Sequence, residues 1–223
     1  MISKDSMYPI ITIDGTAAAG KGTLAKKISR LYNFAHLESG LLYRALAYQM
    51  IKTGAKPEDK LIMESAKSMK FSDLKNPKLR DDEVAKTASI VAKNPKVRKL
   101  LVVFQRNFGT NPPKNAKGSV IDGRDIGTIV FPNTPYKIFI TANLEKRAMR
   151  RHKELQERGI RSIYGDVLKD LKMRDMRDKK RKIAPLKIAK GAYLIDSSDM
   201  LIEDVFKKGI SWLKEQGLQP GIK

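Results

Sequence analysis

The sequence predicts a three-layer α/β protein, in which helices cover both faces of a parallel sheet. Short apolar runs typical of buried strands alternate with helical patterns along the 223 residues. The first apolar run leads directly into a glycine-rich loop that a helix follows, which is typical of a nucleotide-binding core. A hydrophobic share of 41% is ordinary for a globular chain and allows a sizeable core. We therefore expect one folded domain over residues 1–223.

The elements follow from local patterns, taken in chain order. The first strand is predicted over residues 9–14, and the first helix over residues 21–32, where Leu24, Ile28 and Leu31 recur at helical spacing. A short apolar stretch at residues 34–37 precedes a second helix, which opens at Ser39-Gly40 and ends before Gly54 and Pro57. Further strands are predicted over residues 119–122, 136–141 and 192–196, and further helices over residues 144–158, 163–181 and 201–215.

Residues 58–118 differ from the rest of the chain because no convincing strand is found there. The stretch is mostly helical, with breaks at Asn76-Pro77, Asn94-Pro95 and the Asn-Pro-Pro of residues 111–113. An excursion of this kind between two strands of a parallel sheet predicts a helical insertion, which we place at about residues 55–110.

The loop after the first strand has the spacing G-x-x-x-x-G-K-[ST], which is typical of a phosphate-binding loop. Small residues let backbone N–H groups surround phosphate oxygens, and the following helix adds the positive end of its dipole. Lys21 then reaches the β- and γ-phosphates, and the Thr23 hydroxyl binds Mg²⁺. The residues expected to bind the nucleotide phosphates are Gly15, Thr16, Ala17, Ala18, Ala19, Gly20, Lys21, Gly22 and Thr23.

Composition excludes several classes of protein. No cysteine is present, which excludes disulfide scaffolds, thiolate metal sites and cysteine nucleophiles. The first nine residues do not resemble a signal peptide, and no window reaches the ~18 apolar residues that a membrane helix needs. We therefore expect a cytoplasmic enzyme without a membrane segment.

The net charge of +21 raises the possibility of a nucleic-acid partner. Residues 146–190 hold 17 Lys and Arg against 6 Asp and Glu, about half of the excess. Tyr164 is the lone aromatic residue in that segment, so platforms for base stacking are not apparent. An anionic substrate explains the arginines equally well, and nucleic acid is the less expected partner.

Five segments in this order resemble the bacterial cytidylate kinases (CMP kinases) of the nucleoside monophosphate kinase family, and the resemblance runs from about residue 10 to 212. They are the phosphate loop, ESG with YR at residues 38–44, ASIVA and PKVR at residues 88–98, DGRD at residues 122–125, and RDMRDKKR with APL at residues 174–186. The chain departs from the family at Glu38, where Asp is usual, and at Thr16, where Pro is usual. Residues 74–83 are several positions shorter than in larger members, so the hairpin expected there is trimmed.

The resemblance implies transfer of the γ-phosphate of ATP to CMP or dCMP, with Mg²⁺ on the donor phosphates, a basic lid at about residues 150–182 and a monomeric chain. Arg44 and Arg124 would grip the acceptor phosphate, because a guanidinium fork matches phosphate oxygens. Asp122 would hold Mg²⁺ through water, or would instead cap the turn before Gly123. The implied catalytic residues are Lys21, Arg124 and Arg181, and the implied contacts to cytosine are Ser39, Ser89, Arg98 and Asp125.

Arg174, Asp178 and Arg181 lie at i, i+4 and i+7, within roughly 60° of one another on a helix. The resemblance assigns Arg174 and Asp178 to the acceptor sugar and Arg181 to phosphate charge; the alternative is a row of intrahelical ion pairs. Arg147 and Arg151 are assigned to a lid that closes over the donor.

Several alternatives stay open at the level of sequence. Ser39 could merely cap the second helix, and neither His36 nor His152 is expected to act in the reaction. Another acceptor such as UMP, AMP or shikimate is possible, and an RNA-binding protein that uses the loop as a nucleotide switch is the alternative from a different class.

Overall fold

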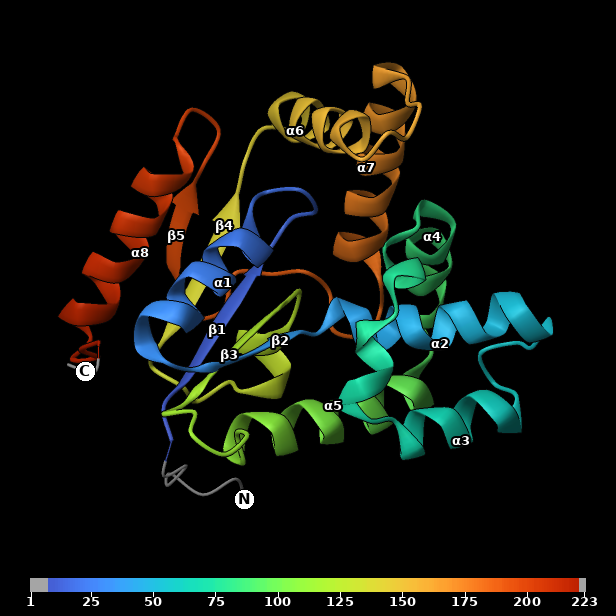
Figure 1. The fold of residues 1–223 in the computed structure, drawn as a ribbon, viewed down its shortest axis with the longest axis horizontal. Helices are drawn as coiled ribbons and strands as arrows, with labels where there is room; N and C mark the ends of the chain where they lie inside the picture. The colour runs from blue at the N-terminus through green and yellow to red at the C-terminus, as the bar shows by residue number, and fades with distance from the viewer. Residues whose placement is uncertain (1–7, 221–223) are drawn as a thin grey trace.

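The computed structural model describes residues 8–220, so most of the segment on which the signal-peptide prediction rests lies outside the described residues. The predicted elements with stated bounds are all present, and their ends differ from the predictions by no more than one residue. Figure 1 shows the sheet running through the middle of the core, with helices on both sides. The predicted α/β class is confirmed.

The sheet has five parallel strands in the order β2-β3-β1-β4-β5, with β1 at its centre. The strands are β1 (Ile10–Gly15), β2 (Ala35–Glu38), β3 (Ser119–Gly123), β4 (Lys137–Thr141) and β5 (Tyr193–Asp196). In this register Asp14 lies opposite Gly123, and Glu38 lies opposite Asp122. The carboxyl ends of these strands therefore meet at one edge of the sheet, where α/β proteins bind ligands.

Two apolar clusters hold the layers together, because β1 alternates its side chains between them. Ile11 and Ile13 pack with residues of α1 (Lys21–Tyr32) and α8 (Ile202–Glu215) on one face. Ile10 belongs to a second cluster on the other face, which includes residues of α2 (Gly40–Thr53) and α5 (Pro95–Thr110). Alternation places Thr12 and Asp14 on that second face.

The predicted insertion consists of α3 (Lys60–Ser68), the 3-10 turns η1 (Phe71–Lys75) and η2 (Pro77–Arg80), α4 (Asp82–Val91) and α5. Two of the three predicted breaks begin helical elements, Asn76-Pro77 before η2 and Asn94-Pro95 before α5, whereas the Asn-Pro-Pro of residues 111–113 follows the end of α5. The Asn94 side chain accepts hydrogen bonds from the backbone N–H groups of Lys96 at 2.9 Å and Val97 at 3.2 Å. No strand occurs among the described residues between positions 58 and 118, and η1 and η2 stand where a hairpin was expected to be trimmed.

The basic segment forms α6 (Leu144–Glu157) and α7 (Tyr164–Lys180), which stand together above the phosphate loop in Figure 1. Their buried side chains, Ala148, Leu155, Val167 and Leu171, form a small cluster with Ala17 of that loop. Between residues 8 and 220, no helix is both long enough and apolar enough to cross a membrane.

One element escaped prediction. A π-helical turn, η3 (Ile126–Val130), follows β3 directly and packs on the second face of the sheet. Its local sequence lacks the periodicity of a helix. Contacts with distant residues, described below, hold the turn in place instead.

Candidate active site

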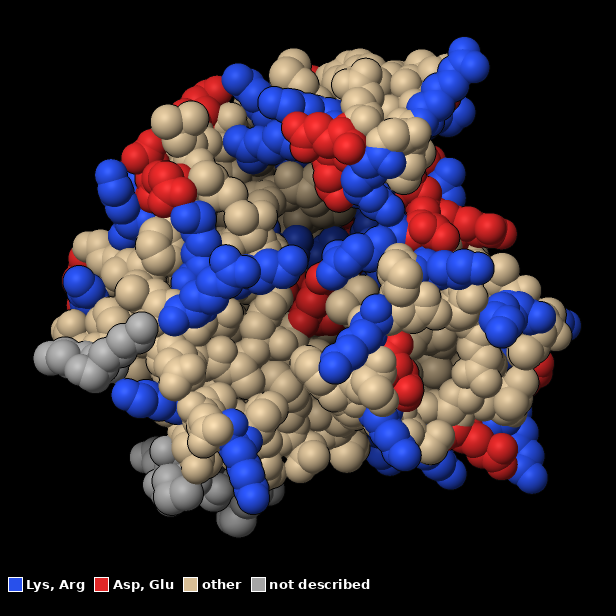
Figure 2. Space-filling model, viewed as in Figure 1, with Lys and Arg blue, Asp and Glu red and all other residues tan. Residues whose placement is uncertain are grey.

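A cleft of about 630 Å³ opens above the carboxyl edge of the sheet. The phosphate loop, the ends of β2 and β3, helix α4 and the two basic helices all contribute to its wall. Figure 2 shows a hollow in this face with Lys and Arg side chains around it and acidic side chains among them. A cleft of this size suits a ligand with the dimensions of a nucleotide.

The phosphate loop requires glycine where the backbone is crowded. A Cβ on Gly15 would lie 1.9 Å from the carbonyl oxygen of Ile140, and Gly20 has a left-handed φ of 94°. Helix α1 begins directly after Gly20, and within the described chain no side chain caps its first turn. Its N-terminal N–H groups are therefore directed at the cleft with the positive end of the helix dipole.

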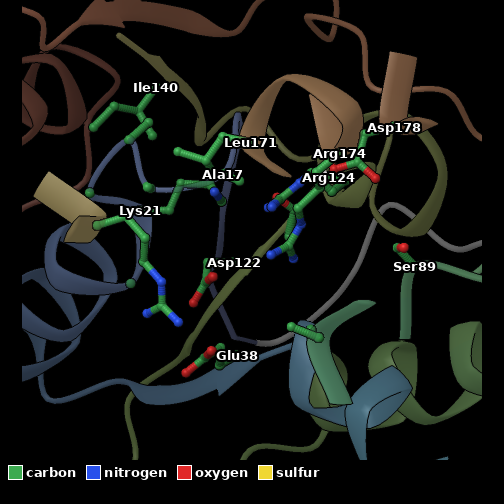
Figure 3. A pocket seen from close by; sticks show the side chains of 18 of the residues that line it. Ala17, Lys21, Glu38, Ser89, Asp122, Arg124, Ile140, Leu171, Arg174 and Asp178 are labelled. Atoms are coloured by element: carbon green, nitrogen blue, oxygen red, sulfur yellow. Dashed lines mark hydrogen bonds and ion pairs between the residues drawn. The ribbon is translucent and has the colours of Figure 1, made fainter. Parts of the chain in front are cut away.

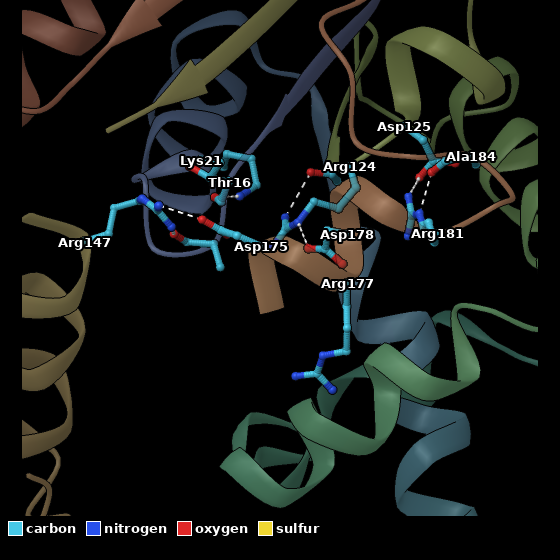
Figure 4. Close-up of polar contacts among 12 residues, drawn as sticks. Thr16, Lys21, Arg124, Asp125, Arg147, Asp175, Arg177, Asp178, Arg181 and Ala184 are labelled. Carbon is cyan, nitrogen blue, oxygen red and sulfur yellow. Dashed lines mark hydrogen bonds and ion pairs between the residues drawn. The ribbon is translucent and has the colours of Figure 1, made fainter. Parts of the chain in front are cut away.

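Lys21 is buried, with 6% of its surface exposed. Its Nζ donates to the backbone carbonyl of Thr16 at 2.6 Å, as the dashed line in Figure 4 marks. Burial, followed by the positive charge of Arg124, lowers the pKa of this ammonium well below its usual value. The charged form of Lys21 is therefore disfavoured in the free protein, and anionic phosphate oxygens close to it would stabilise that form.

Asp122 ends β3 beside the loop, and its Oδ2 is 2.7 Å from Nε2 of His36 on β2. His36, which is not expected to act in the reaction itself, orients this carboxylate. Asp122 and the exposed Thr23 supply the oxygens that Mg²⁺ prefers. No cluster of three or more His, Cys, Asp or Glu able to hold a metal occurs between residues 8 and 220. These residues fit a magnesium ion carried mainly by phosphates and water.

An ion pair between Arg124, which directly follows β3, and Asp178 of the basic helix α7 connects these two elements. Arg124 Nε donates to Asp178 Oδ2 at 2.9 Å, and Arg124 also donates to the carbonyl of Gly123 at 3.1 Å. Burial opposes ionisation of Asp178, but Arg124 and Arg174 together lower its pKa. The alternative of ion pairs within α7 is therefore wrong for Asp178, whose partner comes from another element.

Arg174 lies beside Arg124 and Asp178 in the cleft wall (Figure 3). Its Nε is buried and has no hydrogen-bond partner in the part of the chain that the structure describes. Burial, then the charge of Arg124, lowers the pKa of this guanidinium to about 9. Buried Lys21 and half-buried Arg174 thus form a positive region, and neither side chain makes an ion pair within the described chain.

Asp125 lies at the centre of a second ion-pair group. It pairs with Arg98 of α5, and its Oδ1 is 3.4 Å from a guanidinium nitrogen of Arg181. All three side chains are at most 8% exposed. Arg181 follows α7 directly and also donates to the carbonyl of Ala184 (Figure 4). Tyr43, whose ring lies 5.6 Å from the Arg98 guanidinium, also lines the wall; the sequence interpretation named it as part of the YR pair but assigned it no role.

The remaining predicted acceptor residues lie on the opposite wall. Arg44 donates to the carbonyl of Leu79 at 2.8 Å, and Ser89 donates to the carbonyl of Lys86 at 2.7 Å within α4. Ser39 is buried before α2, but its side chain makes no capping hydrogen bond there, so the alternative role as a helix cap is not observed among the described residues.

Glu38, which replaces the usual Asp, forms an ion pair with Arg80 of η2 at 2.8 Å. The longer side chain therefore connects the end of β2 to the insertion.

The basic helices contact both the loop and the insertion. Arg147 is buried and binds Asp175 at 2.6 Å and the carbonyl of Ala17 at 3.2 Å, so it supports the loop from behind and does not line the cleft. Arg151 does line the cleft, and it pairs with Asp82 of α4. A second pair between the same units joins Lys86 to Asp170 at 2.9 Å.

The structure thus brings the predicted site residues to one cleft, with the exceptions of Gly15 and Thr16, which support the loop from below. Sequence reasoning missed the residues that hold the wall in place, including Asp14, His36, Arg80 and Asp175. A charged residue at the end of a predicted strand was a signal for Asp14, but its partners lie more than a hundred residues away.

Comparisons with known proteins agree with this geometry. Residues 11–215 match the family model described as cytidylate kinase. A cytidylate kinase of Paramagnetospirillum magneticum is 48% identical over 90% of this chain and 95% of its own length. Another, from Bartonella tribocorum, is 44% identical over 92% and 94%. An uncharacterized protein of Eubacterium ventriosum, of known structure and 18% identical, aligns with a TM-score of 0.51 over 93% of this chain and 99% of that one, which shows the fold alone. The chain belongs to the cytidylate kinase family.

Proposed function

We infer that the protein transfers the γ-phosphate of ATP to CMP or dCMP and releases ADP with CDP or dCDP. The observation that carries this inference is the positive region formed by buried Lys21 and half-buried Arg174 around Arg124, at the mouth of a phosphate loop. Phosphoryl transfer between two nucleotides brings like charges together, so it needs cations at the donor, the transferring group and the acceptor. Family membership supports the same reaction.

On the donor side, the loop backbone holds the phosphates of ATP and the Lys21 ammonium moves from the Thr16 carbonyl to the β- and γ-phosphate oxygens. Thr23 and, through water, Asp122 are the residues that would hold Mg²⁺, with His36 fixing the Asp122 carboxylate. When bound, Mg²⁺ neutralises charge on the β- and γ-phosphates.

At the transferring group, Arg124 and Arg181 stabilise the charge on the equatorial oxygens. No general base is required, because the second pKa of a phosphate monoester is near ~6 and the acceptor is largely dianionic at neutral pH. This account fits a chain with only two histidines.

On the acceptor side, Arg44 and Arg124 bind the monophosphate, and Arg174 with Asp178 binds the sugar. Asp125 accepts from the cytosine amino group while Arg98 donates to its ring acceptors, with Ser39 and Ser89 completing the contacts. Uracil presents an acceptor where cytosine presents its amino donor, so Asp125 would face a carbonyl oxygen and UMP would bind poorly. The Asp125 carboxylate is already held by two arginines, which favours this reading.

The Arg151 to Asp82 contact places the basic helices against the insertion. We infer that α6 and α7 form a lid that closes on the donor and excludes water, with the insertion as the acceptor-binding part. A monomeric state and a cytoplasmic location stay predictions.

The test is Mg²⁺- and ATP-dependent ADP formation by the purified protein with CMP, dCMP, UMP, AMP or GMP as acceptor. Lys21→Met protein, prepared in parallel, controls for contaminating kinases. We expect CMP and dCMP to lead the other acceptors by about tenfold or more in kcat/KM. Equal rates with all acceptors, or none with any, would contradict the proposed function.

A further inference from the structure

Asp14 is a buried carboxylate for which the proposed reaction has no use. It immediately precedes the phosphate loop and is 3% exposed. Its partners are two backbone N–H groups of η3: Ile126 donates to Oδ1 at 2.9 Å and Gly127 donates to Oδ2 at 2.7 Å. The Asp14 side chain lies on the second face of the sheet, and no ion pair to it is found in the described chain.

These two N–H groups belong to the first turn of η3, where helical turns leave donors without partners. Asp14 therefore caps η3 from a different element, and both oxygens of the carboxylate are needed to do so. Arg106 fixes the other end of the turn by donating to the carbonyls of Ile129 and Val130, each at 3.0 Å. The turn is held at both ends by side chains that are distant in sequence.

At Gly127, the turn η3 packs closely against β1. A Cβ added to Gly127 would lie 3.0 Å from Thr12 Oγ1, 3.3 Å from the Ala189 Cβ and 3.4 Å from Asp14 Oδ2. Glycine at this position thus lets the turn approach the strand closely enough for the two hydrogen bonds to Asp14.

The residues immediately before η3 are Arg124 and Asp125, which point into the cleft. The carbonyl of Asp125 itself accepts from the N–H of Ile129 at 2.9 Å, so the backbone of Asp125 is part of the capped turn. Asp14 lies near the end of the strand that leads through the phosphate loop to Lys21. Displacing the start of η3 would therefore change the distance between the Asp125 carboxylate and Lys21.

We propose that Asp14 is a positioning residue for acceptor selection, which fixes the segment of Arg124 and Asp125 at a set distance from the phosphate loop. It acts through the η3 backbone and touches neither nucleotide. The proposal rests on the proposed function, because it concerns how the cytosine contact is placed.

Burial raises the pKa of the Asp14 carboxyl to about 7, against the effect of its two N–H donors. Keeping a carboxylate here is therefore unfavourable for stability at neutral pH. A residue with only a packing role could be uncharged, whereas two N–H donors facing one side chain are matched best by two carboxylate oxygens.

Asp14→Asn tests the proposal, because the amide keeps the size and one oxygen but turns an NH₂ group toward the second N–H. We expect the ratio of kcat/KM for CMP to kcat/KM for UMP to fall by about tenfold or more, with most of the change in KM for CMP. The KM for ATP should change by less than about twofold, since the hydrogen bonds that the Asp14 carboxylate accepts in the described part of the chain come from η3 and not from the donor loop.

The matched control is Thr12→Val, on the same face of the same strand. Thr12 is fully buried and its hydroxyl has no hydrogen-bond partner among the described residues, so valine removes no hydrogen bond and keeps the branched shape that packs beside Gly127. The acceptor ratio of this variant should equal that of the wild type. Gly127→Ala is the second test. It keeps the carboxylate but adds a Cβ within 3.0–3.4 Å of Thr12, Ala189 and Asp14, so η3 or these neighbours must shift by a few tenths of an ångström. It should lower the same ratio even if Asp14→Asn fails to fold.

An unchanged acceptor ratio in a folded Asp14→Asn protein would overturn the proposal, as would a ratio that falls equally in Thr12→Val. Loss of activity toward all acceptors in equal proportion, with the ratio intact, would assign Asp14 a role in folding alone and would likewise overturn it. Failure of the proposed function is distinguishable, because the wild-type protein would then show no preference for CMP in the first place.

Discussion

Lys21 offers the sharpest prediction, because its effects on catalysis and on stability are expected to have opposite signs. Methionine at this position keeps the unbranched apolar part of the side chain and removes the ammonium. The loss of one preorganised cation at the transferring phosphate is expected to lower kcat by about 10²- to 10³-fold, equivalent to about 2.7–4 kcal/mol. Binding of ATP should weaken less, because the loop N–H groups remain.

Stability should move the other way. Burial is the largest cause of the lowered Lys21 pKa, and the charges of Arg124 and Arg174 add to it. The one hydrogen bond that Met would lose, to the Thr16 carbonyl, is worth about 1.5–3 kcal/mol as a bond from a charged donor. Because the net pKa shift is downward, the desolvation and repulsion that Met removes outweigh that bond. Lys21→Met should therefore unfold at a temperature equal to or above that of the wild type.

Calorimetry of the ligand-free proteins across pH provides the assay. Between the lowered pKa of Lys21 and its usual value of 10.5, the unfolded chain binds more protons than the folded one. The free energy of unfolding of the wild type should thus gain a rising contribution with pH in this interval, and the variant should lack it. A variant that melts more than about 4 °C below the wild type, roughly 1–2 kcal/mol for a chain of this size, would refute the reasoning. So would a variant with near-normal kcat.

Three further predictions address the rest of the site. Asp125→Asn should lower kcat/KM for CMP by about tenfold to a hundredfold through a lost charge-assisted hydrogen bond, while ATP affinity measured by titration changes little; equal losses would place this residue elsewhere. The double variant Asp82→Asn and Asp170→Asn should keep its melting temperature, because ion pairs near the surface contribute about 0–1 kcal/mol. Spin labels on cysteines introduced into α4 and α7 should nevertheless report a broader distribution of distances between these helices. An unchanged distribution would contradict the inference that the two ion pairs hold the basic helices against the insertion. Because the pKa of Asp14 is raised from 3.8 to about 7, its contribution to the free energy of unfolding should fall as pH rises through that interval, and Asp14→Asn should show a flatter dependence.

The parts of the fold that could be predicted are those whose signals are local. A strand, a glycine-rich loop and a helix follow one another within residues 10–32, and each has its own pattern of apolar or small residues. The Asn94-Pro95 break likewise marks where α5 begins, because Asn94 caps that helix with its own side chain. Signals of this kind need no knowledge of the tertiary structure.

The turn η3 and the pairing of the arginines could not be predicted in this way. Helical spacing correctly placed Arg174 and Asp178 on one face of α7, but it does not say which element that face meets. Asp178 pairs with Arg124, which directly follows β3 and lies 54 positions earlier in the chain. In the same way Ser89 and Arg98 have no local signal for a binding role and were identified only through the family resemblance.

The positively charged side chains of the site are of two kinds, those paired with carboxylates and those without an ion pair in the described chain. Arg98, Arg124 and Arg181 are each held by a carboxylate, which fixes their direction but leaves donors for a ligand. Buried Lys21 and half-buried Arg174 have lowered pKa values, to which repulsion by Arg124 contributes in both cases, so the free protein carries unrelieved repulsion where phosphates are expected to bind. Binding of anionic nucleotides would relieve that repulsion, and this relief would contribute part of the free energy of binding. The paired arginines would set where each nucleotide sits, and the unpaired cations would supply the attraction that brings two like-charged phosphates together.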